Sequence, residues 1–349
     1  MLIRPATFYE KAGIDLVLGN RVTEIDRESQ CIKLHDGGTI PWTRLALATG
    51  ARVRKLSIPG VDLEGVFYLR DLNDVDRIRT YVGKGKSAAI IGGGYIGLET
   101  AASLRKLGMN VTVLEAMPRV LQRVTAPEVS AFYTRVHREE GVEIITDAAV
   151  ASLQGTTAVE AVKLADGTLI KADLVIVGVG VSPATELAEA AGLEVDNGIV
   201  VDEFARTSDP AIVAAGDCTN HYNPIYDLRL RLESVQNATD QAKTAANTLC
   251  GRLEAYHALP WFWSDQYDLK LQIAGLSQGF DEVVLRGDSE SGRSFAAFYF
   301  CKGHLLAVDA INRPKEFMTV RRALAEGRSA DPAQLVDESI DIQQAFSTQ

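Results

Sequence analysis

The sequence predicts an α/β fold of the Rossmann type, followed by a separate α+β domain. Residues 87–115 run from a short apolar stretch through a glycine-rich turn and a helical pattern to a second apolar stretch. Two more apolar runs, residues 174–177 and 212–215, each end at a glycine, as strands do at the ligand-binding edge of a parallel sheet. From Pro260 onward, aromatic residues and short strand patterns take over. These observations favour a parallel sheet before Pro260 and a different domain after it.

The glycine-rich turn has the spacing of a dinucleotide site. Gly92, Gly94 and Gly97 form G-x-G-x-x-G between an expected strand and an expected helix. The first glycine permits a tight turn, the second allows close approach to a pyrophosphate, and the third lets the helix pack on the strand. The helix N-terminus favours an anion because its N–H groups and its dipole point there. The alternative is a glycine-rich turn in an ordinary βαβ unit.

Glu115 ends the second apolar run, 23 residues after Gly92. A carboxylate at this position can accept both ribose hydroxyls of the adenosine half of the dinucleotide. It would repel a 2′-phosphate, so the sequence predicts NADH rather than NADPH.

The composition is that of an ordinary globular protein and narrows the function classes. The chain has 349 residues, 46% apolar and 23% charged, with a net charge of −10 that argues against general binding to nucleic acids or anionic membranes. No stretch approaches the roughly 20 apolar residues of a membrane span, and residues 1–5 lack the apolar core of a signal peptide. The four cysteines stand far apart, without C-x-x-C or metal-site spacing. We therefore expect a cytoplasmic protein with reduced thiols and no metal site.

The remaining patterns predict short strands and helices along the chain. Strands are expected at residues 16–18, 21–25, 31–34, 45–48, 88–91, 111–115, 142–145, 174–177, 212–215, 269–273, 282–285, 295–300 and 305–309, and helices at residues 73–82, 98–107, 128–140, 240–249 and 314–326. The sequence predicts a hairpin at residues 31–40 and a small antiparallel meander at residues 149–165 that turns at Asp166-Gly167.

Three strand ends carry candidate ligand contacts. Thr49-Gly50 follows the expected strand at 45–48, Gly178 to Gly180 follows the strand at 174–177, and Asp217 follows Gly216. Such positions bind ligands in Rossmann-type sheets, and Asp217 could bind a polyol. Each position also has a plainer interpretation: Thr49-Gly50 is only a strand end, Gly178 to Gly180 a glycine turn, and Asp217 a helix N-cap.

The run Trp261-Phe-Trp-Ser-Asp-Gln-Tyr267 is the most distinctive stretch of the C-terminal part. It could belong to that domain's core. Tryptophans beside polar groups also suit a flavin face or a docking surface.

Taken in order, these motifs resemble the FAD-dependent pyridine nucleotide oxidoreductases. Within them, the chain looks most similar to the NADH:ferredoxin reductases that serve cytochrome P450 and Rieske-type oxygenases. The resemblance covers essentially the whole chain and rests on Thr49-Gly50, the glycine turn with Glu99, Gly178 to Gly180, Asp217 and the Trp261 to Tyr267 run. It implies two nested Rossmann-like, three-layer domains for FAD and NAD plus a C-terminal α+β domain. It also implies that electrons pass from NADH through FAD to a [2Fe–2S] ferredoxin.

The resemblance also implies roles for individual residues. Val22, Thr49, Gly50, Arg70, Asp217, Val235 and Trp263 would lie along FAD, and Gly92, Gly94, Tyr95, Ile96, Glu115 and Gly180 would hold NADH. Glu99 would lie beside the nicotinamide as the catalytic residue. The implied domains are residues 1–68 and 183–256 for FAD, 69–182 for NAD, and 257–349 for the C-terminal reductase domain.

Two features depart from the family pattern. The family opens with its own glycine fingerprint for the ADP half of FAD, whereas this sequence contains one fingerprint, the NADH one. The family lysine that would pair with Glu99 is also absent. We expect an N-terminal truncation, which puts tight FAD binding by this chain alone in question.

Two alternatives stay open at this point. One is another FAD/NAD(P)H oxidoreductase, either a disulfide reductase or an NADH oxidase; the other is a non-catalytic NADH-binding chain. A ferredoxin partner would require a local basic patch on this acidic chain. The candidate side chains are Arg52, Arg54, Lys55, Arg229, Arg231, Arg313, Lys315, Arg321 and Arg322.

Overall fold

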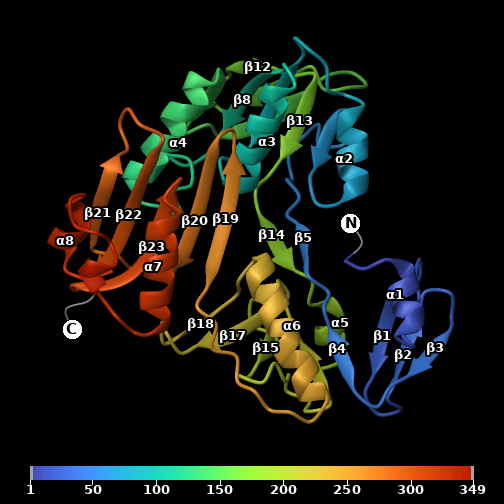
Figure 1. The fold of residues 1–349 in the computed structure, drawn as a ribbon. Helices are drawn as coiled ribbons and strands as arrows, with labels where there is room; N and C mark the ends of the chain where they lie inside the picture. Colours follow the sequence, from blue (N-terminus) through green and yellow to red (C-terminus); the bar gives the residue numbers. More distant parts are fainter. Residues whose placement is uncertain (1–2, 347–349) are drawn as a thin grey trace. The chain divides into compact units, whose positions relative to one another are not determined.

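The computed structural model describes residues 3–346, which divide into two compact units (Figure 1). Unit 1 contains the described residues up to 52 together with 183–257, and unit 2 contains residues 53–182 together with the described residues from 258 on. The C-terminal part therefore belongs to the same compact unit as the glycine-rich turn. The finer domain boundaries expected from the sequence stay a prediction.

Unit 1 is built from three small sheets and three helices. The antiparallel sheet β1-β2-β3, the parallel pair β16-β4 and the sheet β15-β17-β18 surround a core that includes Ile25, Leu47, Ile199 and Ile212. The elements are α1 Ala6–Lys11, β1 Val22–Asp26, β2 Cys31–Leu34, β3 Thr39–Pro41, β4 Leu45–Leu47, α5 Glu186–Ala190, β15 Ile199–Val201, β16 Ile212–Ala214, β17 Thr219–Asn223, β18 Leu228–Leu230 and α6 Val235–Leu249. Strands β5 (Ala51–Val53) and β14 (Val181–Pro183) lie where the chain passes between the units.

Unit 2 begins with a parallel sheet of strand order β6-β13-β7-β8-β9. Alternate residues of its strands face opposite sides, as the two-residue period of a strand requires. Ile90 and Val113 face helices α3 and α4, while Ala89 and Val175 face the meander β10–β12. The elements are β6 Val66–Tyr68, α2 Leu72–Arg79, β7 Ser87–Ile91, α3 Tyr95–Lys106, β8 Asn110–Leu114, α4 Pro127–Glu139, β9 Val142–Ile145, β10 Val150–Gln154, β11 Ala161–Leu164, β12 Leu169–Lys171 and β13 Leu174–Val177.

The C-terminal part of unit 2 is an antiparallel sheet of order β19-β20-β23-β22-β21 with α7 packed on β20 and β23. Its core is continuous with that of the parallel sheet, since Phe132 of α4 contacts Phe295 of β22 with ring centroids 4.9 Å apart. Strand β19 also packs against α3. The elements are β19 Trp261–Gln266, β20 Leu269–Gly275, β21 Glu282–Asp288, β22 Ser294–Cys301, β23 His304–Ile311, α7 Pro314–Ala325, α8 Pro332–Val336 and a 3₁₀ turn, Gln344–Phe346.

Most predicted elements form, and several elements that were not predicted form as well, among them α1, α5, α8, β15 and β19. The apolar run 16–18 is not a strand, and its side chains are about half exposed or more, because an apolar run without a pairing partner is not a stable strand. Helix α6 begins at Val235, five residues before the predicted start, since the Ser234 side chain accepts from the Asn237 N–H and caps it. The hairpin β17–β18 was not predicted, because its polar sequence lacks the alternation of a strand.

Candidate functional site

The glycine-rich turn joins β7 to α3 at the carboxyl end of the parallel sheet. Gly92 has φ +113°, and a Cβ added there would lie 2.4 Å from the Gly178 carbonyl oxygen. A Cβ on Gly97 would lie 2.0 Å from the Gly92 carbonyl oxygen. Because no side chain fits at either position, the two glycines are required for the turn and for the approach of α3 to β7.

Gly94 is different, because it is exposed and an added Cβ would meet nothing within 4 Å. It is the N-cap of α3, and no side chain within residues 3–346 caps this helix end. Gly180, in the loop after β13, likewise borders open space. The unblocked helix N-terminus and the bare backbone on both sides fit the phosphates of a dinucleotide. The sequence prediction that Gly94, Tyr95, Ile96 and Gly180 hold NADH concerns these same positions.

Glu115 lies directly after β8, and the backbone fixes its carboxylate at the rim of the turn. Its Oε2 accepts from the Gly93 N–H at 2.6 Å, and its Oε1 accepts from the Met117 N–H at 2.8 Å. Each carboxylate oxygen has a second lone pair that can accept from a sugar hydroxyl. The side chain is half-buried, so the carboxylate remains accessible. This geometry suits the ribose contact predicted from the sequence.

Glu99 lies on α3, slightly more than one turn after Tyr95, and is half-buried. Its Oε1 accepts a hydrogen bond from the Ser264 hydroxyl of β19 at 2.5 Å. Burial raises the pKa of Glu99, the Ser264 bond opposes this rise, and the charge of Asp265 adds to it. The first six residues of the Trp261 to Tyr267 run form strand β19, whose inward-facing Ser264 contacts the predicted catalytic residue.

In unit 1, the structure brings together Thr49, Gly50 and Asp217. Strands β4 and β16 are parallel neighbours, so Thr49-Gly50 and Asp217 follow the carboxyl ends of two paired strands. The Thr49 hydroxyl donates to the Ala184 carbonyl oxygen at 2.6 Å, and Gly50 has φ +65°. Two adjacent strand ends with a hydroxyl and a half-buried carboxylate fit the polyol part of a flavin nucleotide.

The other residues predicted along FAD belong to other elements of the chain. Val22 is the first residue of β1, in a different sheet of unit 1, and Val235 is the first residue of α6 with 63% of its surface exposed. Arg70 and Trp263 belong to unit 2. The exposed Trp263 ring lies 5.5 Å from the Trp261 ring, centroid to centroid.

Several arginines considered for a basic patch have structural contacts. Arg229 donates to the carbonyl oxygens of Val201 and Asn220, and the largely buried Arg231 pairs with Glu233 at 2.5 Å. Arg52, Arg313, Lys315 and Arg322 also form ion pairs with acidic side chains. Arg321 instead lies 4.9 Å above the Trp261 ring. The two arginines Arg229 and Arg231 are therefore part of the packing of unit 1.

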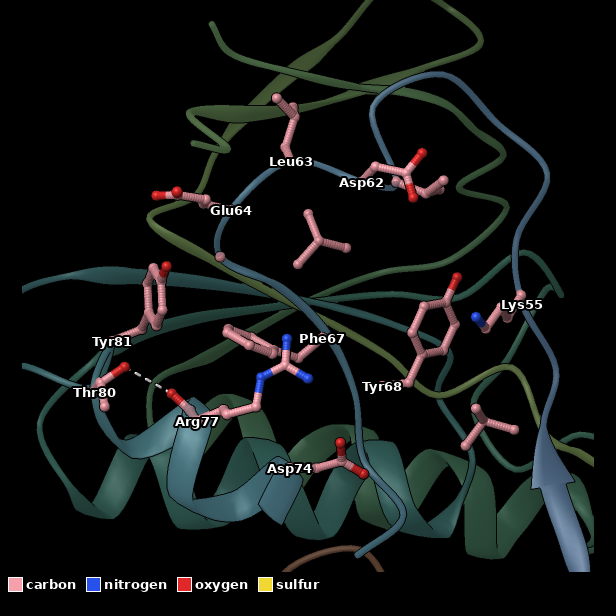
Figure 2. A pocket seen from close by; sticks show the side chains of 14 residues that line it. Lys55, Asp62, Leu63, Glu64, Phe67, Tyr68, Asp74, Arg77, Thr80 and Tyr81 are labelled. Atoms are coloured by element: carbon pink, nitrogen blue, oxygen red, sulfur yellow. Dashed lines mark hydrogen bonds between the residues drawn. The ribbon is translucent and has the colours of Figure 1, made fainter. Parts of the chain in front are cut away.

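A separate pocket of about 620 Å³ lies beside the edge strand β6 (Figure 2). Arg77, whose guanidinium lies 5.1 Å from the centroid of the Phe67 ring, lines it together with Lys55 and Tyr68. None of the residues predicted to bind FAD or NADH lines this pocket. It is distinct from the glycine-rich turn.

The sequence matches two protein families over most of its length. Residues 5–242 match the family described as Pyridine nucleotide-disulphide oxidoreductase, and residues 261–346 match the one described as Reductase C-terminal. The chain belongs to the pyridine nucleotide-disulphide oxidoreductases, which are FAD-dependent enzymes that use NAD(P)H.

The most informative relatives are ferredoxin reductases. Putidaredoxin reductase of Pseudomonas putida is 44% identical over 99% of this chain and 83% of its own length. A ferredoxin–NAD(+) reductase component of the anthranilate 1,2-dioxygenase system of Burkholderia cepacia is 41% identical over 97% of this chain and 84% of its own length. In the crystal structure of the covalent putidaredoxin reductase–putidaredoxin complex, one chain superposes with a TM-score of 0.96 at 43% identity, over 100% of this chain and 86% of that chain. The predicted fold class and enzyme class are confirmed.

Two further observations concern residues 3–346. None of their helices is both long enough and apolar enough to cross a membrane. They contain no group of three or more His, Cys, Asp or Glu side chains that could hold a metal ion.

Proposed function

We propose that this chain passes electrons from NADH through FAD to a [2Fe–2S] ferredoxin that feeds an oxygenase or a cytochrome P450, and that it acts in the cytoplasm. The observation that carries the proposal is the site in unit 2. There, the start of α3 has no side-chain cap, and the Glu115 carboxylate is bonded to the Gly93 N–H just before this helix. The half-buried Glu99 lies slightly more than one turn further along the same helix. The identities with ferredoxin reductases, above 40% over nearly the whole chain, support the choice of partner.

Each part of the site has its own task in this proposal. The N–H groups at the start of α3 bind the pyrophosphate, and Glu115 accepts from the adenosine ribose. Glu99, further along α3, orients the nicotinamide end by accepting a hydrogen bond. The redox chemistry would come from bound FAD, which would supply a hydride acceptor that can release electrons one at a time. The protein's part is to position the two cofactors and exclude water, so no side chain need act as a nucleophile.

Ferredoxin binding needs positive charge that is not already neutralised. Within residues 3–346, Arg54, Lys55 and Arg321 have no ion pair, and all three are in unit 2. We propose these three cations, rather than the packed Arg229 and Arg231, as contributors to a basic docking patch.

The test is the visible spectrum of the purified 349-residue chain, before and after addition of FAD and then NADH. The proposal expects a flavin band that NADH bleaches, followed by reduction of an added [2Fe–2S] ferredoxin. Bleaching with turnover of a disulfide instead of ferredoxin would indicate a disulfide reductase. NADH binding without any flavin band would indicate a chain that does not carry out the reaction by itself.

A further inference from the structure

A chain of four hydrogen bonds crosses the interior of unit 2 and ends at Glu99. The Tyr267 hydroxyl and the His137 Nδ1 are 3.0 Å apart, and the His137 Nε2 and the Gln266 Oε1 are 2.8 Å apart. The Gln266 Nε2 then donates to the Ser264 Oγ at 3.0 Å, and the Ser264 hydroxyl donates to the Glu99 Oε1 at 2.5 Å. The residues come from α3, α4 and the β19 hairpin.

The donors of this chain all point toward Glu99. Because a carboxylate can only accept, the Ser264 hydroxyl hydrogen is committed to Glu99, and the Ser264 Oγ must accept from the Gln266 NH₂ group. The Gln266 Oε1 therefore faces His137, which must carry its proton on Nε2. The His137 Nδ1 is then left to accept from the Tyr267 hydroxyl. Only one arrangement of protons satisfies every member.

Burial makes this arrangement rigid. His137, Gln266 and Ser264 are at most 1% exposed, while Tyr267 and Glu99, at the two ends, are half-buried. Burial also lowers the pKa of His137, which favours the neutral ring that this hydrogen-bond arrangement requires. Because water does not compete in the interior, each hydrogen bond strengthens the next. Since every donor points toward Glu99, the series of hydrogen bonds favours a negative charge on the Glu99 carboxylate.

Glu99 has no basic partner within unit 2. No Lys or Arg of residues 53–182 or 258–346 forms an ion pair with it, so the Ser264 hydroxyl is the group that holds its carboxylate. The bond uses Oε1, which leaves Oε2 able to accept from a ligand. The Gln266 amide cannot readily pass on a proton. The series of hydrogen bonds therefore orients Glu99 and does not conduct protons.

We propose that Ser264, held by Gln266 and His137, is a positioning residue that fixes the Glu99 carboxylate toward the nicotinamide end of the NADH site. This inference rests on the proposed function, because that function places the nicotinamide beside Glu99. The proposal gives Ser264 and Gln266, the buried residues of the Trp261 to Tyr267 run, a role in the site.

The experiment compares Ser264→Ala with Ser264→Thr, which keeps the hydroxyl. We expect Ser264→Ala to slow flavin reduction by NADH in the FAD-loaded enzyme about tenfold, as loss of a hydrogen bond to a charged group does, with little change in KM for NADH. Ser264→Thr should restore most of the rate. In a Glu99→Gln background, Ser264→Ala should add no further loss, because Ser264 acts through Glu99. Full activity of Ser264→Ala, or a loss that adds to that of Glu99→Gln, would overturn the proposal.

A second measurement does not depend on turnover. The ¹⁵N NMR shifts of His137 should report a neutral ring with the proton on Nε2 in the wild-type protein, and Gln266→Leu should change that pattern. If the wild-type His137 ring carries its proton on Nδ1, the proposed arrangement of hydrogen bonds from Tyr267 to Glu99 is wrong. If the wild type shows the expected His137 pattern but NADH does not reduce its flavin, the proposed function fails while the hydrogen-bond chain stands.

Discussion

The Tyr299 hydroxyl donates to the Asp309 carboxyl at 2.5 Å in the fully buried core of the C-terminal sheet. The same Tyr299 oxygen accepts from the Ala126 N–H at the start of α4, so the pair links strands β22 and β23 to the parallel-sheet part of unit 2. The other carboxyl oxygen, Oδ1, has no hydrogen-bond partner among the described residues. Burial raises the pKa of Asp309 to about 7, and the Tyr299 bond only partly opposes this.

This pair predicts that unit 2 loses stability as the pH rises toward neutrality. The folded-state pKa of Asp309 is raised above the unfolded value of about 3.9, so the folded state binds the proton more tightly. The stabilisation is complete below about pH 4 and is lost as the pH rises through about 7. A rise of this size in the pKa of Asp309 corresponds to roughly 4 kcal/mol of unfolding free energy. In urea unfolding between pH 5 and pH 8.5, Asp309→Asn should depend less on pH than the wild type.

The matched control for this measurement is Asp62→Asn, since Asp62 is exposed in a loop. Its unfolding curve should follow the wild type at every pH. A constant difference between wild type and Asp309→Asn across the range would contradict the assignment.

A second prediction concerns Gly94, the glycine at the open start of α3. Its φ is −79°, which any residue adopts, and an added methyl group meets no atom within 4 Å. Gly94→Ala should therefore leave the melting temperature unchanged. The methyl group would occupy the space into which the pyrophosphate is proposed to fit, so the Kd for NADH should rise about tenfold or more. Isothermal titration with NADH measures the effect.

The control for Gly94→Ala is Gly83→Ala, which lies before the start of β7, at the end opposite to Gly94. There an added methyl group meets only the flexible Lys86 side chain. NADH should bind Gly83→Ala as it binds the wild type. Equal affinities for both variants would place the pyrophosphate elsewhere.

Glu115 gives a prediction about the choice between NADH and NADPH. Glu115→Gln keeps the shape of the side chain but removes the charge that would repel a 2′-phosphate, and it loses one of the two acceptors for the Gly93 and Met117 N–H groups. The ratio of kcat/KM for NADH to that for NADPH should fall by roughly tenfold, the effect of one charge-assisted contact. Steady-state assays with a small dye as electron acceptor measure this ratio. A ratio that does not move would show that Glu115 only supports the turn.

The sequence was most informative where one residue type has one physical task. Gly92 and Gly97 leave no room for a Cβ, so their spacing alone located the turn, and the acidic end of β8 located Glu115. The apolar runs likewise gave the strands of the parallel sheet, because strands buried on both faces read as continuous apolar runs.

The sequence could not reveal contacts between distant segments. Ser264 and Glu99 are 165 residues apart, and nothing in the polar letters of the Trp261 to Tyr267 run indicates which face of β19 meets α3. The role of Arg231 was also hidden, since an arginine beside a glutamate reads as a surface charge until its burial is known. Burial alternates along β19, inward at Ser264 and Gln266, and only this structural pattern identifies the face that meets α3.

The last prediction concerns Arg286, which holds the C-terminal segment of unit 2 onto β21. This buried side chain donates to the carbonyl oxygens of Leu335, Asp337 and Ile340 at 2.7–3.0 Å, and it lies 3.5 Å from the buried Glu316 carboxylate. Arg286→Met would leave three carbonyls and part of a carboxylate without their donor. Breaking a buried pair in this way costs about 3–5 kcal/mol of unfolding free energy.

Hydrogen exchange separates the local from the global part of that cost. In Arg286→Met, amides of residues 335–346 should lose protection first, because the segment's main anchor is gone, and the urea midpoint should fall. Arg322→Met is the matched control, since Arg322 is 79% exposed and pairs with Glu326 on the surface, where an ion pair is worth about 0–1 kcal/mol. If the two variants unfold alike, Arg286 does not anchor the segment, and the 3₁₀ turn at Gln344–Phe346 must be held by other contacts such as that of Arg328 with the Phe346 carbonyl.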